Sequence, residues 1–171
     1  MLRKIFSAVM VLALIVITSN VSAAEPRIGF AGYVQDIGWM NPVRNGGMIG
    51  TVGRNKRLEA FVINSDGDIR YNAHVQNIGW QGWMHSGEVA GTANESLRIE
   101  AVMIDLGRRL SRHYDIYYRA HVQDIGWLGW ARNGEPAGTS GASLRLEALQ
   151  IQLVPKGTAF DHNPGEAYYQ R

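Results

Sequence analysis

The chain of 171 residues repeats one block of sequence three times. The most distinctive segment is the run His-Val-Gln-Asp-Ile-Gly-Trp at 121–127, which recurs with small changes at 74–80 and 33–39. A Gly-Thr pair and an Arg-x-Glu-Ala box follow each copy in the same order. Because a repeated sequence builds a repeated structural unit, the chain is expected to fold as three copies of one short structure that share a core.

The repeats span about 28–64, 71–106 and 118–154 and are called repeats one, two and three. The tryptophans that end the run are 41 and 47 residues apart, and the glutamates of the boxes show the same two spacings. Each repeat therefore keeps its internal length. The six additional residues fall in the connection 106–117, which we expect to form a longer surface loop.

Strand signals dominate each repeat. Residues 118–123 alternate between apolar and polar, and 144–154 is rich in branched side chains. The 20 glycines against 5 prolines favour many turns over long helices. We predict an all-β fold in which the last strand of a repeat pairs with the first strand of the next, as the Asp66-Gly67 turn signal suggests.

The same kind of pairing between the last strand of repeat three and the first strand of repeat one would close the ring. Closure would leave no open sheet edge. Three repeats of about forty residues then fit a pseudo-threefold closed arrangement that is β-prism-like, with a β-trefoil as the alternative. Residues 155–171 carry two prolines and no periodicity, so we expect a loose C-terminal tail.

Residues 1–24 have the pattern of a secretory signal peptide. Arg3 and Lys4 precede an apolar run, and small residues follow at 19–24. The apolar run covers 5–17, whereas a membrane-spanning helix needs roughly twenty residues. We expect cleavage before Ala24 or Glu25 and a secreted protein that meets the membrane only through the signal peptide.

Composition excludes several classes of function. The chain has 17 basic and 15 acidic residues, and two of the basic ones, Arg3 and Lys4, lie in residues 1–24. Residues 25–171 are therefore neutral overall, which argues against nucleic-acid binding. The absence of cysteine removes disulfides and thiolate chemistry. No nucleophile elbow, His-Glu-x-x-His or phosphate loop occurs. We therefore expect no enzyme activity, no catalytic residues, no cofactor and no metal.

Two tryptophan positions lead to different expectations. The first is occupied in every repeat, so its indoles are expected in the core around the threefold axis; they are Trp39, Trp80 and Trp127. The second is occupied by Trp83 and Trp130 but by Pro42 in repeat one. A symmetric core would not readily exchange tryptophan for proline, so these two indoles are expected at the surface, as ligand platforms or as incidental exposure.

The Arg-x-Glu boxes place a base and an acid on one face of a strand. We interpret them as partly buried ion pairs that link neighbouring repeats and stabilise the structure. The pairs are Arg57–Glu59, Arg98–Glu100 and Arg145–Glu147. The alternative is a carboxylate for chemistry or for sugar hydroxyls, but one glutamate per repeat lacks the second carboxylate of a glycoside hydrolase.

Polar side chains in the tryptophan run complete the candidate ligand site of Trp83 and Trp130. They are His74, Gln76, Asn77, His121, Gln123 and Asp124. Tyr33 replaces the histidine in repeat one, which favours a hydrogen-bonding role over metal binding. The change between aspartate and asparagine suits a turn or a hydroxyl contact and argues against a required negative charge.

The run His-Val-Gln-Asp-Ile-Gly-Trp-Leu-Gly-Trp, followed by Asn-Gly-Glu-Pro-Ala-Gly-Thr and Ser-Leu-Arg-Leu-Glu-Ala, resembles the ChW repeat, the clostridial hydrophobic repeat with a conserved tryptophan. Repeats two and three match closely, and repeat one lacks the second tryptophan. The resemblance implies an exported bacterial protein whose repeats bind surfaces, polysaccharides or other proteins. We therefore expect a secreted binding module for a carbohydrate or cell-surface polymer, with an extracellular protein partner as the alternative.

Overall fold

The computed structural model describes residues 26–162 and 165–171. These residues form strands, turns and loops and contain no helix, which confirms the all-β prediction for this part of the chain. It follows that no helix in these ranges could cross a membrane. The signal peptide expected over residues 1–24 lies outside the described residues.

Each repeat contains two long strands at its ends and three short strands between them. Repeat one contains β1 (Ile28–Val34), β2 (Gly38–Trp39), β3 (Val43–Arg44), β4 (Met48–Gly50) and β5 (Leu58–Ser65). Repeat two contains β6 (Ile69–Val75), β7 (Gly79–Trp80), β8 (Met84–His85), β9 (Val89–Gly91) and β10 (Ile99–Leu106). Repeat three contains β11 (Tyr114–Val122), β12 (Gly126–Trp127), β13 (Ala131–Arg132), β14 (Ala137–Ser140) and β15 (Leu146–Pro155), and β16 (Tyr168–Gln170) follows it.

The two long strands of each repeat pair with each other in antiparallel orientation. β1 pairs with β5, β6 with β10 and β11 with β15. The prediction that the last strand of a repeat pairs with the first strand of the next is therefore wrong. Residues Asp66 and Gly67 do lie in a turn, but this turn connects β5 to β6, which belong to different sheets.

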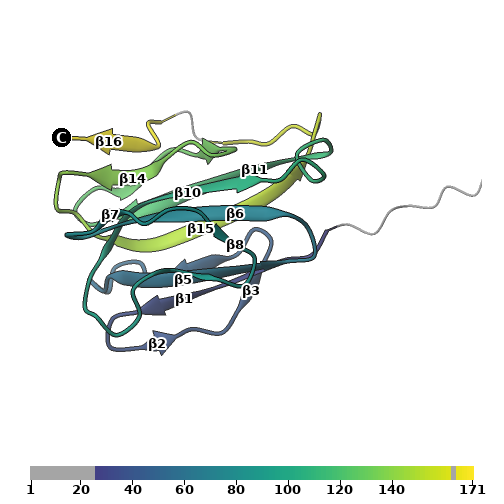
Figure 1. Ribbon diagram of the computed structural model, residues 1–171. Coiled ribbons are helices and arrows are strands. Elements are labelled where there is room, and N and C mark those ends of the chain that lie inside the picture. The colour runs from purple at the N-terminus through teal and green to yellow at the C-terminus, as the bar shows by residue number, and fades with distance from the viewer. Residues whose placement is uncertain (1–25, 163–164) are drawn as a thin grey trace, which may run out of the picture.

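A short strand of each repeat leaves its own repeat and completes the sheet of another. β9 of repeat two pairs with β5, and β4 of repeat one pairs with β15. β14 of repeat three pairs with β10 (Figure 1). Each of the three sheets therefore contains strands from two repeats. Repeat two gives a strand to repeat one, repeat three gives one to repeat two, and repeat one gives one to repeat three. We call this arrangement the cyclic strand exchange.

The exchange explains why the predicted ring closure is absent. The free side of β15 is taken by β4, so β15 does not reach β1, and none of the three sheets closes on itself. A β-trefoil, the alternative expectation, would need its strands to form a closed barrel, which the described strands do not form. The structure therefore shows three repeats whose strands form three sheets, none of which is closed.

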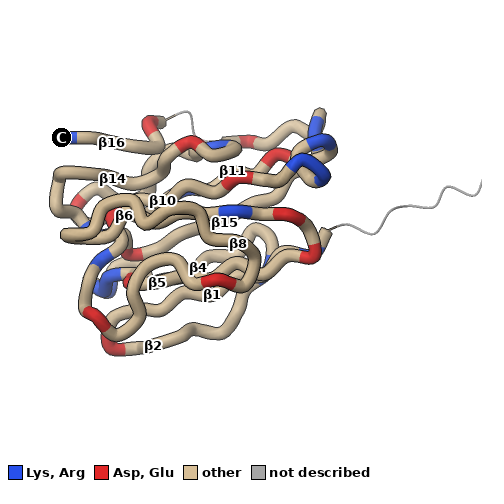
Figure 2. The backbone as a smooth tube through the Cα atoms, in the orientation of Figure 1, with Lys and Arg blue, Asp and Glu red and all other residues tan. Residues whose placement is uncertain are grey.

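One apolar core joins the three repeats. Its members come from equivalent strand positions and form a single cluster, because alternate residues of every long strand point inward. Examples are the trios Val34, Val75 and Val122; Leu58, Ile99 and Leu146; and Ile63, Ile104 and Ile151. Most Lys, Arg, Asp and Glu residues lie toward the ends of the strands and in the connections (Figure 2).

Two buried tyrosines of the core form hydrogen bonds with loops. The hydroxyl of Tyr71 donates to the carbonyl of Glu88, and the hydroxyl of Tyr118 donates to the carbonyl of Glu135. Burial raises the pKa of both phenols, so they remain neutral donors at ordinary pH. Phe30 occupies the same place in repeat one and fills it without a hydroxyl.

The C-terminal segment is attached to the domain, so the expectation of a loose tail is wrong for its described part. β16 adds a parallel strand to β14. The ring of Phe160 lies 4.5 Å from that of Tyr117 and 5.1 Å from that of Trp130, centroid to centroid, and His162 stacks on Phe160. The two prolines and the lack of periodicity gave no indication that Phe160 and His162 pack against aromatic rings of repeat three.

Phe160→Ala is expected to lower the free energy of unfolding by about 1–2 kcal/mol, because it removes ring contacts with Tyr117 and Trp130. Urea unfolding measures this change, and quenching of indole fluorescence by acrylamide should increase as Trp130 loses its cover. Tyr169→Ala is the matched control, since that ring is exposed. Equal effects of the two substitutions would contradict a docked tail.

Candidate functional site

Each repeat carries a buried glutamate that is paired with an arginine. The glutamates are 3–5% exposed, and the three are Glu59, Glu100 and Glu147. In every repeat, a guanidinium Nη2 lies 2.7 Å from Oε1 of the glutamate two residues further along the same strand. Three buried carboxylates at the same distance from an arginine make this a repeated structural feature.

In repeats two and three, the first strand supplies a third member of the network. Nδ1 of His74 lies 3.2 Å from Oε2 of Glu100, and Nδ1 of His121 lies 3.3 Å from Oε2 of Glu147. Tyr33 replaces the histidine in repeat one, and its hydroxyl donates to Oδ1 of Asn94 in repeat two. The two histidines are therefore partly buried beside carboxylates, which differs from the open ligand surface expected for them.

The Arg–Glu ion pairs are present as predicted, but they do not themselves link neighbouring repeats. Two residues apart on a strand, arginine and glutamate already share a face, so each pair forms within one repeat. Backbone hydrogen bonds of the exchanged strands link the repeats, together with side-chain contacts such as that of Tyr33 with Asn94. The amide of Thr92 donates to the carbonyl of Glu59, and the amide of Thr51 donates to that of Glu147, both at 2.8 Å.

The first tryptophans are not in the core, and that prediction is wrong. Trp39 is 45% exposed, and Trp80 and Trp127 are half-buried. Each indole meets the ring of the preceding Tyr33, His74 or His121 edge-on, with centroids 5.3–5.6 Å apart. The indoles therefore cover the Arg–Glu–His network from outside, and smaller aliphatic side chains fill the centre.

Backbone conformation explains the Asx residues of the tryptophan run. Asp36, Asn77 and Asp124 have φ of 59°, 65° and 62°. Aspartate and asparagine tolerate this left-handed conformation better than other residues with side chains. The neighbouring Gln76 and Gln123 are half-buried, and their backbone N–H groups donate to the carbonyls of Arg98 and Arg145. A turn thus accounts for the Asx positions without a ligand.

Trp83 lies at the surface, as expected. It is 39% exposed, and the guanidinium of Arg70 lies 4.5 Å from its ring centroid. Arg70 also pairs with Asp105 at 2.6 Å, which holds the guanidinium over the ring. The arrangement gives an aromatic surface bordered by one base and one acid.

Trp130 is more enclosed than Trp83. The guanidinium of Arg119 lies 4.6 Å from the ring centroid of Trp127 and 4.8 Å from that of Trp130. Phe160 of the C-terminal segment covers Trp130 further. The two second tryptophans, which the sequence treats as equivalent, therefore differ in access.

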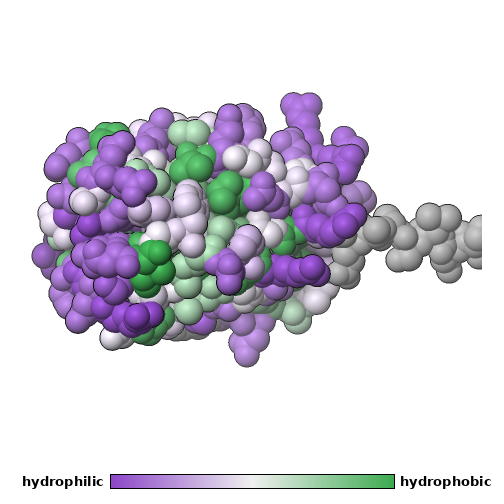
Figure 3. Space-filling view, turned by 90° about the horizontal axis from the view of Figure 1, so that it is seen from below, coloured by the Kyte–Doolittle hydropathy of each residue, from purple (hydrophilic) through white to green (hydrophobic). Residues whose placement is uncertain are grey.

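The tip of each tryptophan run exposes an isoleucine. Ile37, Ile78 and Ile125 are 43%, 50% and 49% exposed. Apolar side chains appear as several separate green patches within a hydrophilic surface on the face shown in Figure 3. Their exposure at the same place in every repeat makes these isoleucines candidates for contacts outside the fold.

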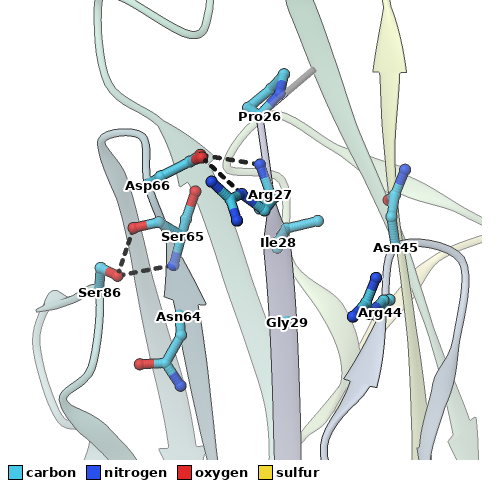
Figure 4. Close-up of a pocket in the computed structure, with 10 residues that line it drawn as sticks. All are labelled: Pro26, Arg27, Ile28, Gly29, Arg44, Asn45, Asn64, Ser65, Asp66 and Ser86. Atoms are coloured by element: carbon cyan, nitrogen blue, oxygen red, sulfur yellow. Dashed lines mark hydrogen bonds and ion pairs between the residues drawn. The ribbon is translucent and has the colours of Figure 1, made fainter. Parts of the chain in front are cut away.

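An open cavity of about 600 Å³ lies at the start of β1 (Figure 4). The tryptophan run begins at the opposite end of this strand, at Tyr33. Its lining residues are Pro26, Arg27, Ile28, Gly29, Arg44, Asn45, Asn64, Ser65, Asp66 and Ser86. Asp66 pairs with Arg27, and Ser86 exchanges hydrogen bonds with the backbone of Ser65. The side chains of Arg44 and Asn64 have no hydrogen-bond or ion-pair partner among the described residues, and the two residues lie on either side of Gly29.

The cavity results from a difference between the repeats. Gly29 takes the place that Arg70 has in repeat two and Tyr117 has in repeat three. Arg70 fills this place with its pairing to Asp105, and Tyr117 fills it by packing on Phe160. Sequence reasoning missed the cavity, but alignment of the three repeats at this position contains the signal.

The fold and the repeated indole sites define an all-β protein made of three strand-exchanging repeats. The family model ChW, described as Clostridial hydrophobic W, matches residues 33–67, 74–107 and 121–155. These matches cover more than half of the chain, so the chain belongs to the ChW family, as the sequence resemblance indicated. No curated protein and no solved structure matches the chain.

Proposed function

We propose that the protein is a secreted, non-catalytic module that binds a carbohydrate or cell-surface polymer through Trp83 and the polar groups around it. The exposed indole beside the Arg70–Asp105 pair carries the proposal. A sugar ring can stack on an aromatic face, and fixed polar groups at its border can form hydrogen bonds that distinguish one arrangement of hydroxyl groups from another.

The polar cavity supports the same function. Ser86, three residues after Trp83, forms part of its lining, so one segment of repeat two connects the indole with the cavity. The unpaired side chains of Arg44 and Asn64 supply donors and an acceptor of the kind that hydroxyl groups bind. An extended polymer could thus contact the indole and the cavity together.

The non-catalytic part of the proposal rests on the buried glutamates. Each has an arginine at 2.7 Å, and two also face a histidine, so their carboxylates are occupied within the fold. The secreted location rests on the signal-peptide pattern of residues 1–24 and on the ChW resemblance. Neither metal nor cofactor is part of the proposed mechanism.

Trp83→Ala is expected to weaken glycan binding at least tenfold, because truncation of a contacting tryptophan commonly removes more than about 1.4 kcal/mol of binding free energy. A glycan array identifies the ligand, and titration calorimetry gives the change in Kd. Trp130→Ala is the matched control with a smaller expected effect, since Arg119 and Phe160 cover that indole. A folded Trp83→Ala variant with unchanged glycan binding would refute the proposal.

The exposed isoleucines favour a second candidate, an extracellular protein partner. Aliphatic side chains make no hydrogen bonds to sugar hydroxyls, whereas they are common in protein interfaces. Under this alternative, the array gives no signal, and a protein bound by the wild type is lost in a variant with serine at all three positions. The three positions are Ile37, Ile78 and Ile125.

We also infer that the three sheets surround one pseudo-threefold axis in a prism-like arrangement. Two observations support it: the cyclic strand exchange treats the repeats equivalently, and a single core cluster draws the same positions from each repeat. In this arrangement the tryptophan runs of the three repeats would lie at one end of the molecule. A ligand with several epitopes would then meet several indoles at once.

A further inference from the structure

The cavity at the start of β1 contains a row of three residues on neighbouring strands. Gly29 of β1 is directly opposite Asn64 of β5 on one side and directly opposite Arg44 of β3 on the other (Figure 4). Residues that are directly opposite in a sheet project to the same face. The equivalent rows are Asp105, Arg70 and His85 in repeat two, and Gln152, Tyr117 and Arg132 in repeat three. Of the three rows, that of repeat one has no side chain at its centre.

Neither the backbone nor the packing requires a glycine at the centre of this row. The φ of Gly29 is not positive, and a β-carbon added there would have the carbonyl oxygen of Val43 as its neighbour, at an ordinary 3.6 Å. Two strand spacings, roughly 10 Å, separate the backbones of Asn64 and Arg44. The glycine therefore keeps a gap open between two polar side chains.

Repeat three shows which partners an arginine has in this row when the centre is filled. The side-chain hydrogen bond with Tyr117, followed by the charges of Asp115 and Glu135, raises the pKa of Arg132. The backbone N–H of Arg132 also donates to Oε2 of Glu135 at 3.0 Å. This arginine is thus surrounded by one phenol and two carboxylates.

Arg44, at the equivalent place in repeat one, has none of these three partners. In their places, in the order just given, stand Gly29, Arg27 and Gly47. The turn after Arg44 is nevertheless the same, because the N–H of Gly47 donates to the Arg44 carbonyl at 2.8 Å and the equivalent bond in repeat three measures 3.0 Å. Repeat one therefore keeps the arginine and lacks the groups that would occupy it.

The charges that line the cavity leave Arg44 uncompensated. They belong to Arg27, Arg44 and Asp66. Asp66 accepts from the backbone N–H of Arg27 at 2.9 Å and lies 3.6 Å from its Nε. The equivalent residues of repeat two contain an acid and no arginine; they are Asp68, His85 and Gly107. The cavity of repeat one thus offers a single free positive charge.

The other groups around the cavity suit a polymer with hydroxyl groups. The side-chain amide of Asn64 can both donate and accept hydrogen bonds, and it has no partner among the described residues. A second hollow of about 170 Å³ shares Pro26 and Asn45 with the first and extends to Tyr114. A chain that places one unit beside Arg44 can therefore continue into the second hollow.

We infer that the cavity binds one anionic unit of the cell-surface polymer, with its negative charge on Arg44 and its hydroxyl groups on Asn64. The anionic group is a sugar carboxylate or a phosphodiester, since both present the pair of oxygens that a guanidinium binds. The inference rests on the proposed function and makes it more specific, because it selects acidic polymers over neutral ones. A polymer on Trp83 would gain a second contact at Arg44.

The test uses two charged probes and one neutral probe. Trigalacturonic acid carries carboxylates, a glycerol phosphate trimer carries phosphodiesters, and the methyl ester of trigalacturonic acid keeps the sugar rings without the charge. Titration calorimetry with the full chain should show binding of at least one charged probe. Arg44→Gln should weaken that binding about tenfold, because hydrogen bonds between charged groups are much stronger than neutral ones, and should leave binding of the methyl ester unchanged.

Arg132→Gln is the matched control, because it removes the equivalent charge from repeat three and should leave binding of every probe unchanged. Gly29→Tyr reproduces the row of repeat three, fills the gap and should abolish binding of the charged probe to the cavity. The probe that depends on Arg44 identifies the anionic group as a carboxylate or a phosphodiester.

Binding of neither charged probe would overturn the inference, and so would equal affinity of the wild type and folded Arg44→Gln. An equal loss in Arg132→Gln would also overturn it, because net charge alone would then be the cause. Trp83→Ala separates the inference from the proposed function. If Trp83→Ala weakens glycan binding and Arg44→Gln does not, the Trp83 site stands and the cavity site fails. If the charged probe depends on Arg44 but not on Trp83, the cavity site stands and the Trp83 site fails.

Discussion

Gly91→Ala should lower the free energy of unfolding by about 3 kcal/mol or more, a large share of the stability of a domain of this size. Gly91 has φ of +94°, where a β-carbon costs about 1–2 kcal/mol. That β-carbon would also lie 2.7 Å from Cα of Ala60, in the backbone of the partner strand. A backbone overlap of this kind adds about 1–3 kcal/mol, because neither strand of the exchange can move aside freely.

Gly79→Ala is the matched control for this prediction. Gly79 has φ of +81°, but an added β-carbon would have no neighbour within 4 Å. Its expected cost is therefore about 1–2 kcal/mol, from backbone conformation alone. Urea unfolding followed by fluorescence and circular dichroism measures both variants. If Gly79→Ala were as destabilising as Gly91→Ala, close contact at the exchanged strand would not be the cause.

Glu100→Ala should destabilise the fold by about 3 kcal/mol. Oε1 of Glu100 accepts from Nη2 of Arg98 at 2.7 Å and from Nε at 2.9 Å, and Oε2 faces His74. Removal of the buried carboxylate leaves the arginine without its partner, and loss of one member of a buried pair typically costs about 3–5 kcal/mol. Partial exposure of the guanidinium places the expected value at the lower end.

The control for the carboxylate is Glu95→Ala, which removes an exposed acid from the same repeat and should change stability by less than about 0.5 kcal/mol. The double variant Arg98→Met with Glu100→Leu should recover part of the loss, because it leaves no unpaired arginine. A Glu100→Ala variant as stable as Glu95→Ala would show that the network does not stabilise the fold.

The sequence predicts the strands of this protein well and their partners poorly. Alternation and glycine positions depend on local geometry, so the long strands fall where expected. Pairing depends on which edges are left free once the core forms, and β9 reaches β5 only after a crossing between repeats. The Asp66-Gly67 signal indicates a turn, but a turn does not show whether its flanking strands share a sheet.

The positions of the tryptophans show a similar limit. An indole repeated three times resembles a core residue, but the preceding glycine, Gly38 in repeat one, has φ of +86° and turns the chain so that the ring lies outside the network. The exchange with Pro42 predicts a surface position for Trp83 and Trp130; Trp83 is exposed, whereas Trp130 is half-buried. Their different access depends on Phe160, which lies far along the chain and outside the repeats.

Differences between the repeats carry information that the shared motif does not. Gly29 in place of Arg70 opens the cavity, and Met40 in place of Gln81 leaves the Gly50 amide without the side-chain acceptor that Gly91 has. Both positions can be read from an alignment of the repeats once the strand order is known. The shared residues thus describe the fold, and the differing residues locate the sites.

Hydrogen–deuterium exchange on wild type and Gly91→Ala tests the cyclic strand exchange most directly. If the repeats form one cooperative unit, weakening the contact between β9 and β5 should reduce amide protection in β5, β10 and β15 by a similar free energy. Loss of protection confined to β5 and β9, with β11 and β15 unchanged, would mean that the repeats unfold independently and would contradict the account.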